Sequence, residues 1–253
     1  MELEAYANIF QIEERLWWYR GRRDVCFPLL EKHLGNSSEL EVLDVGCGTG
    51  YNLKLLEKYG RARGVDMSEE ALRFCRERGV TDVTLHEAEV LPFPDETFDL
   101  LTAFDVIEHI SDDRQALSEF GRLLKPRGWM LIYTPALPWL YNDHDRKVHH
   151  KRRYVRDELK EKIETAGFEI IHLSYVNFLI LPAVLAARVM LYFRPREHAE
   201  MEIPPEPLNG FFSALCKLES YLVNSVGLPY GMTLVALARK KPGIDQKGLK
   251  SPI

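Results

Sequence analysis

The chain has 253 residues, of which 46% are hydrophobic and 28% are charged, so it can bury a substantial core within one large domain. Its formal net charge of -5 argues against nucleic acid as a partner, because binding a phosphate backbone requires a basic face. The four cysteines have neither CxxC nor zinc-ligand spacing, which predicts free thiols in a reducing compartment.

Residues 1–35 are predicted to be helical. The chain begins with acidic side chains and its first twenty residues lack the apolar core of a signal peptide, which predicts a cytoplasmic protein. We expect the stretch LWWYRGRR, residues 16–23, to end this N-terminal helix with three adjacent aromatic side chains.

Residues 36–175 alternate between strand and helix patterns, which is typical of a parallel sheet with helices on both faces. The predicted strands are 40–45, 61–66, 82–87, 99–107, 129–135 and 168–176, followed by a last strand at 231–240. The predicted helices are 51–59, one capped by Ser68 that ends at Gly79, one that begins at 111–113 and is closed by KPRG (125–128), and 156–166. The predicted fold class is α/β, with a Rossmann-like, doubly wound, seven-stranded and mostly parallel sheet.

Residues 176–230 separate the last two predicted strands and form an insertion. They are predicted to contain an apolar helix, a proline-rich stretch at 202–210 and an amphipathic helix at 211–225. Because long insertions inside a compact domain are usually functional, we expect this helical insertion to cover a binding site. The apolar segment 170–193 is interrupted by polar residues and falls short of a membrane span; core packing, a dimer contact and contact with a membrane surface are alternatives for it. The tail 241–253 is predicted to be disordered.

The stretch VLDVGCGTGYNLKLLEKYG, residues 42–60, contains the strongest functional signal. Gly46, Gly48 and Gly50 lie between a predicted strand and a predicted helix, where glycine permits positive φ and close approach of a ligand to the backbone. Asp66 ends the next strand, twenty residues after Gly46, where an acid is suited to bind both hydroxyls of a ribose. The pattern predicts an adenosine-containing cofactor at the carboxyl edge of the sheet.

The residue ahead of the glycines distinguishes between cofactors. Dinucleotide-binding folds favour GxGxxG, whereas this loop reads GxGxG and follows Asp44. A carboxylate there would repel phosphate but suits the α-ammonium group of S-adenosyl-L-methionine, which carries a ribose and no phosphate. A nicotinamide-dependent oxidoreductase and a strand-to-helix turn without function are the alternatives.

The motifs LDVGCGTG, GVDMSEEAL, HEAEVLPFPDETFDLL, AFDVIEHI and LLKPRGWMLIYTP follow one another between about residues 40 and 135. Together they resemble the successive motifs of class I S-adenosylmethionine-dependent methyltransferases of the type-11 group. The resemblance implies that Asp44 and the glycine loop, including Cys47, hold the methionine part of the cofactor. It also implies that Asp66 binds the ribose and that the product is S-adenosyl-L-homocysteine.

The same resemblance assigns the rest of the cofactor site. Met67 is expected to flank the adenine, and Glu87 with Ala88 stands where the family usually has Asp-Ala next to the adenine amino group. Phe104 is expected to shape the floor beneath the sulfonium.

In similar proteins an N-terminal helix lies over the cofactor as a lid. By this likeness residues 1–35 form the lid, and Trp18, Tyr19 and Arg22 close the pocket, with Arg22 or Arg23 reaching the cofactor carboxylate. Simple packing of this helix on the sheet is the alternative.

Methyl transfer from a sulfonium mainly requires alignment of the reacting atoms and exclusion of water, and a base is needed only when the acceptor must lose a proton. Glu108 and His109 lie just past the fourth predicted strand. His109 is the first candidate for a general base or acceptor-orienting group, and Glu108 is expected to contact the acceptor. A helix-entry histidine bonded to the backbone is the alternative.

The loop TPALPWLYNDHDRKVHHKRRY, residues 134–154, is expected to bind the acceptor, with His150 and Tyr154 near the chemistry. Its other expected substrate-binding residues are His144, His149, Arg152 and Arg153, of which the arginines are suited to an anionic group. A solvated polar loop and a metal site that adds Asp143 and Asp145 are alternatives; without an HExxH-type signature, we predict no metal. The loop also resembles the HD…HxRRY loop of a bacterial methyltransferase subgroup often placed beside cell-envelope glycan genes.

The sequence therefore predicts a methyltransferase that modifies an oxygen, or a nitrogen, of a small or lipid-linked acceptor. The alternatives are a noncatalytic S-adenosylmethionine-binding regulatory protein and a C-methyltransferase acting on a lipid-like quinone or glycan. The expected partners are the acceptor and, as an open alternative, a membrane surface, in a monomer or homodimer.

Overall fold

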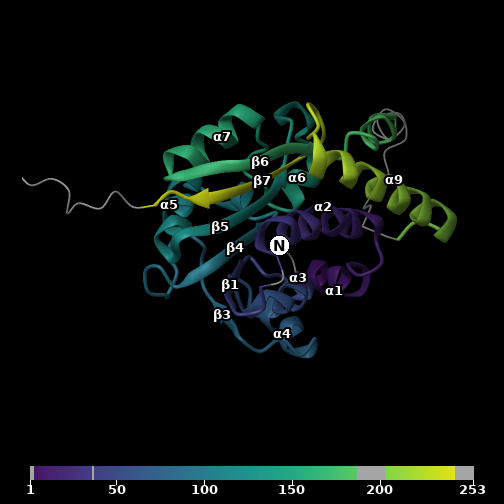
Figure 1. Cartoon of the computed structure of the whole chain (residues 1–253). Coiled ribbons are helices and arrows are strands. Elements are labelled where there is room, and N and C mark those ends of the chain that lie inside the picture. Colours follow the sequence, from purple (N-terminus) through teal and green to yellow (C-terminus); the bar gives the residue numbers. More distant parts are fainter. Residues whose placement is uncertain (1–2, 36, 187–202, 243–253) are drawn as a thin grey trace, which may run out of the picture.

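A computed structural model describes residues 3–35, 37–186 and 203–242 of the chain as one seven-stranded sheet with flanking helices (Figure 1). The strand order is β3-β2-β1-β4-β5-β7-β6, and only β7 runs antiparallel to its neighbours. The strands are β1 Leu40–Val45, β2 Gly60–Asp66, β3 Val83–Leu85, β4 Phe98–Phe104, β5 Leu124–Pro135, β6 Phe168–Val176 and β7 Thr233–Lys240. The predicted fold class is confirmed.

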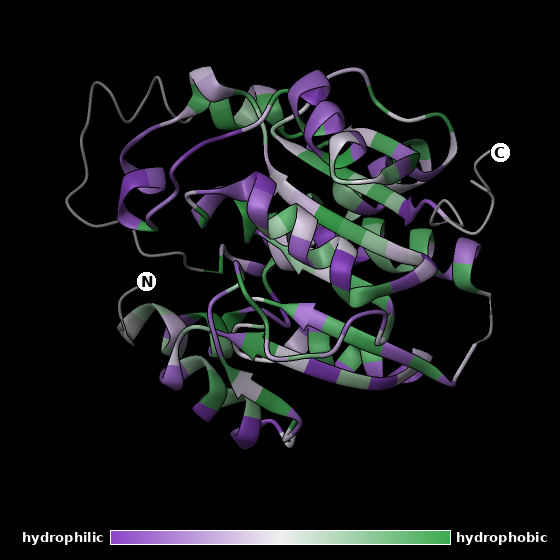
Figure 2. Ribbon diagram, turned by 90° about the vertical axis from the view of Figure 1, so that its left-hand side faces the viewer, coloured by the Kyte–Doolittle hydropathy of each residue, from purple (hydrophilic) through white to green (hydrophobic). Residues whose placement is uncertain are grey.

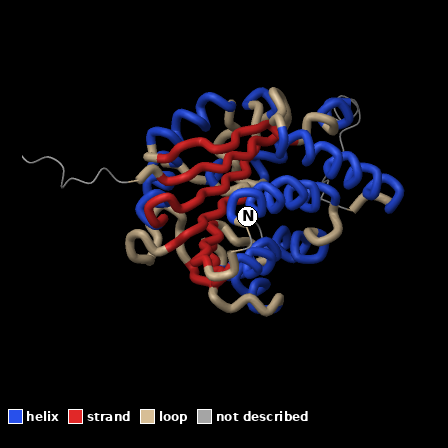
Figure 3. Tube along the Cα trace, viewed as in Figure 1, coloured by secondary structure: helices blue, strands red, loops and turns tan. Residues whose placement is uncertain are grey.

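Helices connect the strands and cover both faces of the sheet (Figure 3). The α-helices are α1 Leu3–Ile12, α2 Trp17–Leu34, α3 Tyr51–Leu56, α4 Glu69–Glu77, α5 Asp113–Leu123, α6 Asp143–Lys147, α7 Arg156–Thr165 and α9 Glu206–Ser225. The 3-10 helices are η1 Glu57–Tyr59, η2 Ile107–His109 and η3 Pro138–Leu140.

Successive side chains of each strand point to opposite faces of the sheet, so the core has two layers, one on each face. In β1, Leu43 and Val45 face one layer while Val42 faces the other, and Leu100 and Leu101 divide in the same way in β4. Helices α5 and α7 cover the first layer, and α2, α3 and α4 cover the second. Figure 2 shows the resulting runs of hydrophobic residues on the central strands, as expected of strands buried on both faces.

One predicted boundary is wrong at the start of β5. KPRG, residues 125–128, was expected to close the preceding helix, but these residues lie inside a strand that begins at Leu124. Leu124 pairs with Phe98, and a register shift between Phe98 and Leu100 absorbs the additional residues, with Arg127 at φ 64°. A proline-glycine pattern that usually marks a turn here marks an irregularity in the sheet.

The N-terminal region also differs from the prediction, because it forms two helices and LWWYRGRR begins the second one. No side chain of the local sequence caps α2 at Leu16. Asn209 in α9 does so instead: its Oδ1 accepts from the Trp17 N–H at 3.0 Å, and its Nδ2 donates to the Arg15 carbonyl at 3.1 Å. The two helices lie side by side in Figure 1. A residue almost two hundred positions away therefore decides where α2 starts.

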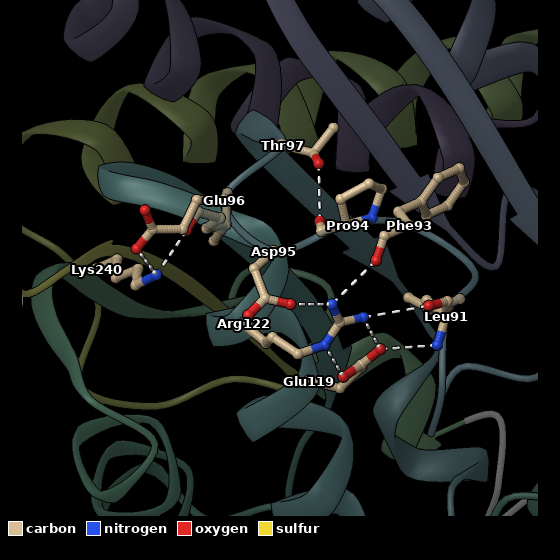
Figure 4. A network of polar contacts seen from close by, with 10 residues as sticks. Leu91, Phe93, Pro94, Asp95, Glu96, Thr97, Glu119, Arg122 and Lys240 are labelled. Atoms are coloured by element: carbon tan, nitrogen blue, oxygen red, sulfur yellow. Dashed lines mark hydrogen bonds and ion pairs between the residues drawn. The ribbon is translucent and has the colours of Figure 1, made fainter.

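The loop between β3 and β4 is held by Arg122 of α5 (Figure 4). Its guanidinium donates to the carbonyls of Leu91 and Phe93 at 3.2 and 2.9 Å and to Asp95 Oδ1 at 2.6 Å. Glu119 accepts from Arg122 at 2.7 Å and from the Leu91 N–H at 2.7 Å. This network fixes the predicted proline-broken loop, which leads into β4.

Parts of two predictions lie outside the described residues. Residues 187–202 include the end of the predicted apolar helix, of which residues 181–186 are helical, and residues 243–253 include most of the predicted tail. Among the helices that the structure describes, none has both the length and the apolar character needed to cross a membrane.

Replacing Asn209 with alanine should lower the free energy of unfolding by about 1–2 kcal/mol, because it leaves the Trp17 N–H and the Arg15 carbonyl without their partner. Urea-induced unfolding monitored by tryptophan fluorescence measures the change. Ser213→Ala is the matched control on the same helix, since the buried Ser213 hydroxyl makes no hydrogen bond with the described residues. Equal losses in the two variants would contradict the capping role.

Candidate active site

The glycine loop leaves β1 in a conformation that its sequence requires. Gly46, Gly48 and Gly50 have φ values of 66°, 56° and 83°, all in the left-handed region that favours glycine. A Cβ at Gly46 would lie 2.5 Å from a methyl group of Val106, whereas a Cβ at Gly48 would meet nothing within 4 Å. The backbone at Gly48 therefore faces open space that a ligand can approach.

Asp44 lies at the end of β1 beneath this loop, with 1% of its surface exposed. Its Oδ1 accepts from the Thr102 hydroxyl at 2.6 Å. Burial raises the pKa of Asp44 to about 7, and the nearby Arg22 opposes this rise. A buried carboxyl of this kind gains from a cationic ligand group, because the cation stabilises the ionised form.

Asp66 at the end of β2 is held by backbone donors. Its Oδ2 accepts from the Gly48 N–H at 2.9 Å, and its Oδ1 accepts from the Ser68 N–H at 3.0 Å. Burial raises the pKa of Asp66, although these N–H groups favour the ionised form. The carboxylate is thus fixed beside the open face of Gly48. Tyr6 of α1 covers this region, where burial and then Asp66 raise the pKa of Tyr6 to about 12.

Three charged or polar side chains that sequence reasoning missed join α1 to the loop. The buried Glu13, just past α1, accepts hydrogen bonds from the Thr49 hydroxyl and from Arg78 Nη2, the latter at 2.6 Å. Arg78 Nε also donates to the Thr49 carbonyl at 3.1 Å. The partners are 29 to 65 residues apart, so no local motif announces the contact.

The expected aromatic-arginine pair of α2 lies over the end of β4. Arg22 forms an ion pair with Asp105 at 2.7 Å, and its guanidinium carbon lies 5.1 Å from the Tyr19 ring centroid and 5.4 Å from that of Phe104. Asp105, which sequence analysis did not single out, has φ 54° directly after the strand. Arg23 points elsewhere and donates to the Glu13 carbonyl at 2.8 Å.

The residues expected around an adenine follow β2 and β3, which are adjacent parallel strands. Met67 is 72% exposed beside Asp66. Glu87 is exposed, while Ala88 is half-buried against the core. All three therefore lie at the same sheet edge as the glycine loop, and their roles stay predictions.

A second group forms at the neighbouring strand ends. The side chain of Glu108 is fully buried; its Oε2 accepts from the Thr134 hydroxyl at 3.0 Å, and its Oε1 lies 3.8 Å from His150 Nε2. The rings of His109 and His150 meet edge to face with centroids 4.7 Å apart. Burial and then Asp105 raise the pKa of Glu108, while burial and then His150 lower the pKa of His109 to about 4.

His150 is oriented from behind by Asp145 of α6. The His150 Nδ1 lies 2.8 Å from Asp145 Oδ1, which also accepts from Arg153 Nε at 2.8 Å. Burial alone would raise the pKa of Asp145, but the hydrogen bonds from His150 and Arg153 lower it below its usual range. Sequence analysis offered Asp145 only as a metal ligand and did not foresee this contact.

Other predicted acceptor residues have different surroundings. Tyr154 is 0% exposed, and its hydroxyl donates to Asp113 at 2.7 Å, which also accepts from Arg152 at 2.9 Å and from Lys162 at 2.6 Å. Arg153 is engaged with Asp145. His144 and His149 are exposed and lie outside the Glu108–His109–His150 group.

These residues fit S-adenosylmethionine. A buried carboxyl stands at the strand end where the cofactor's ammonium is expected, a second carboxylate is fixed beside it, and the intervening backbone is open at Gly48. The fold and the site together define the class I methyltransferase arrangement.

Comparisons with known proteins support the same class of protein. Residues 43–132 match the family model of a methyltransferase domain. A "probable S-adenosylmethionine-dependent methyltransferase" of Mycolicibacterium smegmatis is 33% identical over 174 residues, which are 67% of this chain and 66%, just under two thirds, of that relative. The ubiquinone biosynthesis O-methyltransferase of Parvibaculum lavamentivorans is 27% identical over 65% of this chain and 72% of its own length.

Among solved structures, phosphoethanolamine N-methyltransferase 2 of Haemonchus contortus in complex with S-adenosyl-L-methionine superposes with a TM-score of 0.58 at 19% identity. The superposition covers 85% of this chain and 52% of that one, and it shows the shared fold. The chain therefore carries a class I S-adenosylmethionine-dependent methyltransferase domain of the type-11 group at residues 43–132, and its cofactor is S-adenosyl-L-methionine.

The pKa of Asp44 predicts a pH-dependent stability difference. Because its pKa rises from 3.8 unfolded to about 7 folded, the folded protein retains a proton that the unfolded chain has lost between these values. The corresponding stability is fully present below the unfolded pKa and is lost as pH rises through 7. Asp44→Asn lacks this titrating group. Without cofactor, its free energy of unfolding relative to that of wild type should therefore increase by about 2 kcal/mol from about pH 5 to pH 8. Urea titrations at both pH values test this, and a difference independent of pH would refute it.

Proposed function

We propose that this methyltransferase transfers the methyl group to an oxygen of a small-molecule acceptor. The observation that carries the proposal is the packing of His109 against His150 above the buried carboxylate of Glu108. A hydroxyl must lose a proton on methylation, and imidazoles oriented by carboxylates are suited to position the hydroxyl and accept its proton. The name of the Parvibaculum relative also favours oxygen. A nitrogen acceptor is the alternative.

The cofactor site in this proposal uses the residues at the ends of β1, β2, β3 and β4. When bound, S-adenosylmethionine supplies a methyl group on positively charged sulfur. Asp44 stabilises the ammonium group, and Asp66 accepts hydrogen bonds from the ribose hydroxyls. The other proposed contacts are Gly46, Cys47, Gly48 and Gly50 with the methionine part, Met67, Glu87 and Ala88 with the adenine, and Tyr19, Arg22 and Phe104 near the sulfonium.

The acceptor site is proposed to centre on His109 and His150. Neutral imidazole accepts a proton, and burial keeps His109 neutral near neutral pH by lowering its pKa. Tyr154, buried with its hydroxyl on Asp113, is better suited to hold the loop than to touch an acceptor. Arg152 and Arg153 are likewise paired within the protein.

The covering elements are also part of the proposal. Residues 1–35 act as the lid, which the contacts of Glu13 with Thr49 and of Arg22 with Asp105 support. Residues 176–230 cover the acceptor. An amphiphilic acceptor is a second candidate, because α9 exposes large apolar side chains, namely Leu208, Phe211, Leu218, Tyr221 and Leu222.

Asp66→Asn should weaken binding of S-adenosylmethionine and of S-adenosylhomocysteine by about 10- to 100-fold, because it removes the charge that accepts the ribose hydroxyls. Isothermal titration calorimetry measures both affinities, and the thermal unfolding of the ligand-free variant checks that the loop remains folded. Asp82→Asn, at the half-buried residue before β3, is the matched control and should bind as wild type does. Equal affinity of Asp66→Asn and wild type would exclude the proposed ribose contact.

The acceptor class can be tested with the full chain and S-adenosylmethionine labelled in its methyl group. We expect transfer to hydroxyl compounds, and a loss of at least about 100-fold in kcat for His109→Gln with unchanged cofactor affinity. His172→Gln, on the edge strand β6, is the control. Labelling of amines alone would contradict an oxygen acceptor, and labelling only of lipid-linked hydroxyls would select the amphiphilic candidate.

A further inference from the structure

A group of three side chains in the proposed acceptor site has the composition of a metal site. Its members are Glu108, His109 and His150. One ligand atom from each of these three side chains lies within 4.8 Å of the other two. Glu108 and His109 come from η2 after β4, whereas His150 follows α6, so only the folded chain brings the three together. Two imidazoles and one carboxylate form a ligand set typical of zinc, iron and cobalt ions.

The buried carboxylate of Glu108 supplies an independent indication of a ligand. Its Oε1 has no hydrogen-bond partner in the described part of the chain, although the side chain is fully buried. Such an oxygen is costly unless something compensates it. The 3.8 Å separation from His150 Nε2 is too long for a hydrogen bond, but two ligands at about 2.1 Å from one tetrahedral ion lie about 3.4 Å apart.

The surroundings of the two histidines suit metal coordination. Asp145 accepts from His150 Nδ1, which places the proton on that nitrogen and leaves the Nε2 lone pair directed toward Glu108. A carboxylate behind a histidine in this way orients metal-binding imidazoles in many proteins. The ring of His109 meets that of His150 edge to face, with the centroids 4.7 Å apart. The Lys151 N–H donates to the Glu108 carbonyl at 2.8 Å and joins the two segments.

We infer that Glu108, His109 and His150 bind one divalent transition-metal ion, with an open coordination position for the acceptor hydroxyl. The inference deepens the proposed function and rests on it for the role of the ion, though not for its binding. With the ion bound, the two imidazoles hold the ion instead of accepting the proton. The ion lowers the pKa of the hydroxyl, whose proton leaves to water. The oxygen then bonds to the methyl carbon as the carbon–sulfur bond breaks, and its electron pair stays on sulfur to give S-adenosylhomocysteine and a methyl ether.

Binding is tested with Co²⁺ as a spectroscopic probe on the full chain after treatment with a chelator and dialysis. Visible absorption follows coordination, and equilibrium dialysis with elemental analysis gives the stoichiometry. We expect one Co²⁺ per chain, displaced by Zn²⁺. Glu108→Gln and His150→Gln should each weaken binding by more than about tenfold, and Asp145→Asn by about tenfold through the orientation of His150. His172→Gln, on the edge strand β6, is the matched control and should bind Co²⁺ as wild type does.

Glu108→Gln keeps an acceptor for the Thr134 hydroxyl and a side chain of the same size, so it should fold, which a thermal unfolding curve without metal checks. Absence of stoichiometric Co²⁺ binding, or unchanged affinity in folded Glu108→Gln, overturns the inference. Activity measurements distinguish failure of the metal inference from failure of the proposed function. Cobalt binding that depends on Glu108 without transfer to any hydroxyl would refute the proposed function alone. Undiminished transfer in chelator-treated enzyme would refute the role of the ion alone.

Discussion

The structure depends on carboxylates placed out of water at the ends of parallel strands. Asp44 and Asp66 end β1 and β2, and Asp105 and Glu108 follow β4, so all four lie at one edge of the sheet. Burial disfavours the ionised forms of Asp44, Asp66 and Glu108 and raises their pKa values. An edge built in this way gains stability from a positively charged ligand. That requirement connects the fold to a sulfonium cofactor and, beside it, to the proposed metal ion.

Different partners hold these four carboxylates. Asp66 is fixed by backbone N–H groups of Gly48 and Ser68, Asp44 by the Thr102 hydroxyl, and Asp105 by Arg22 of α2. Glu108 differs, because one of its oxygens meets no hydrogen-bond donor within the described residues. The contrast distinguishes Asp44, Asp66 and Asp105, whose contacts lie within the protein, from Glu108, whose Oε1 is the proposed metal ligand.

The N-terminal helices and α9 act on this edge as one unit. Asn209 of α9 caps α2, and α2 carries Arg22 to Asp105. Glu13, in the link between α1 and α2, reaches both Thr49 of the glycine loop and Arg78 after α4. The glycine loop is therefore stabilised from above by contacts between distant segments.

The sequence by itself determined the sheet, the glycine loop and the cofactor class. Those signals are local: alternating apolar strands, glycines where φ is positive, and Asp44 and Asp66 at strand ends. It misjudged KPRG and the start of α2, because a sheet irregularity and the side chain of Asn209 override local turn and helix patterns. Only the tertiary structure paired Arg22 with Asp105 and brought His150 to Glu108, since contacts between residues about forty or more apart leave no periodic trace in a single sequence.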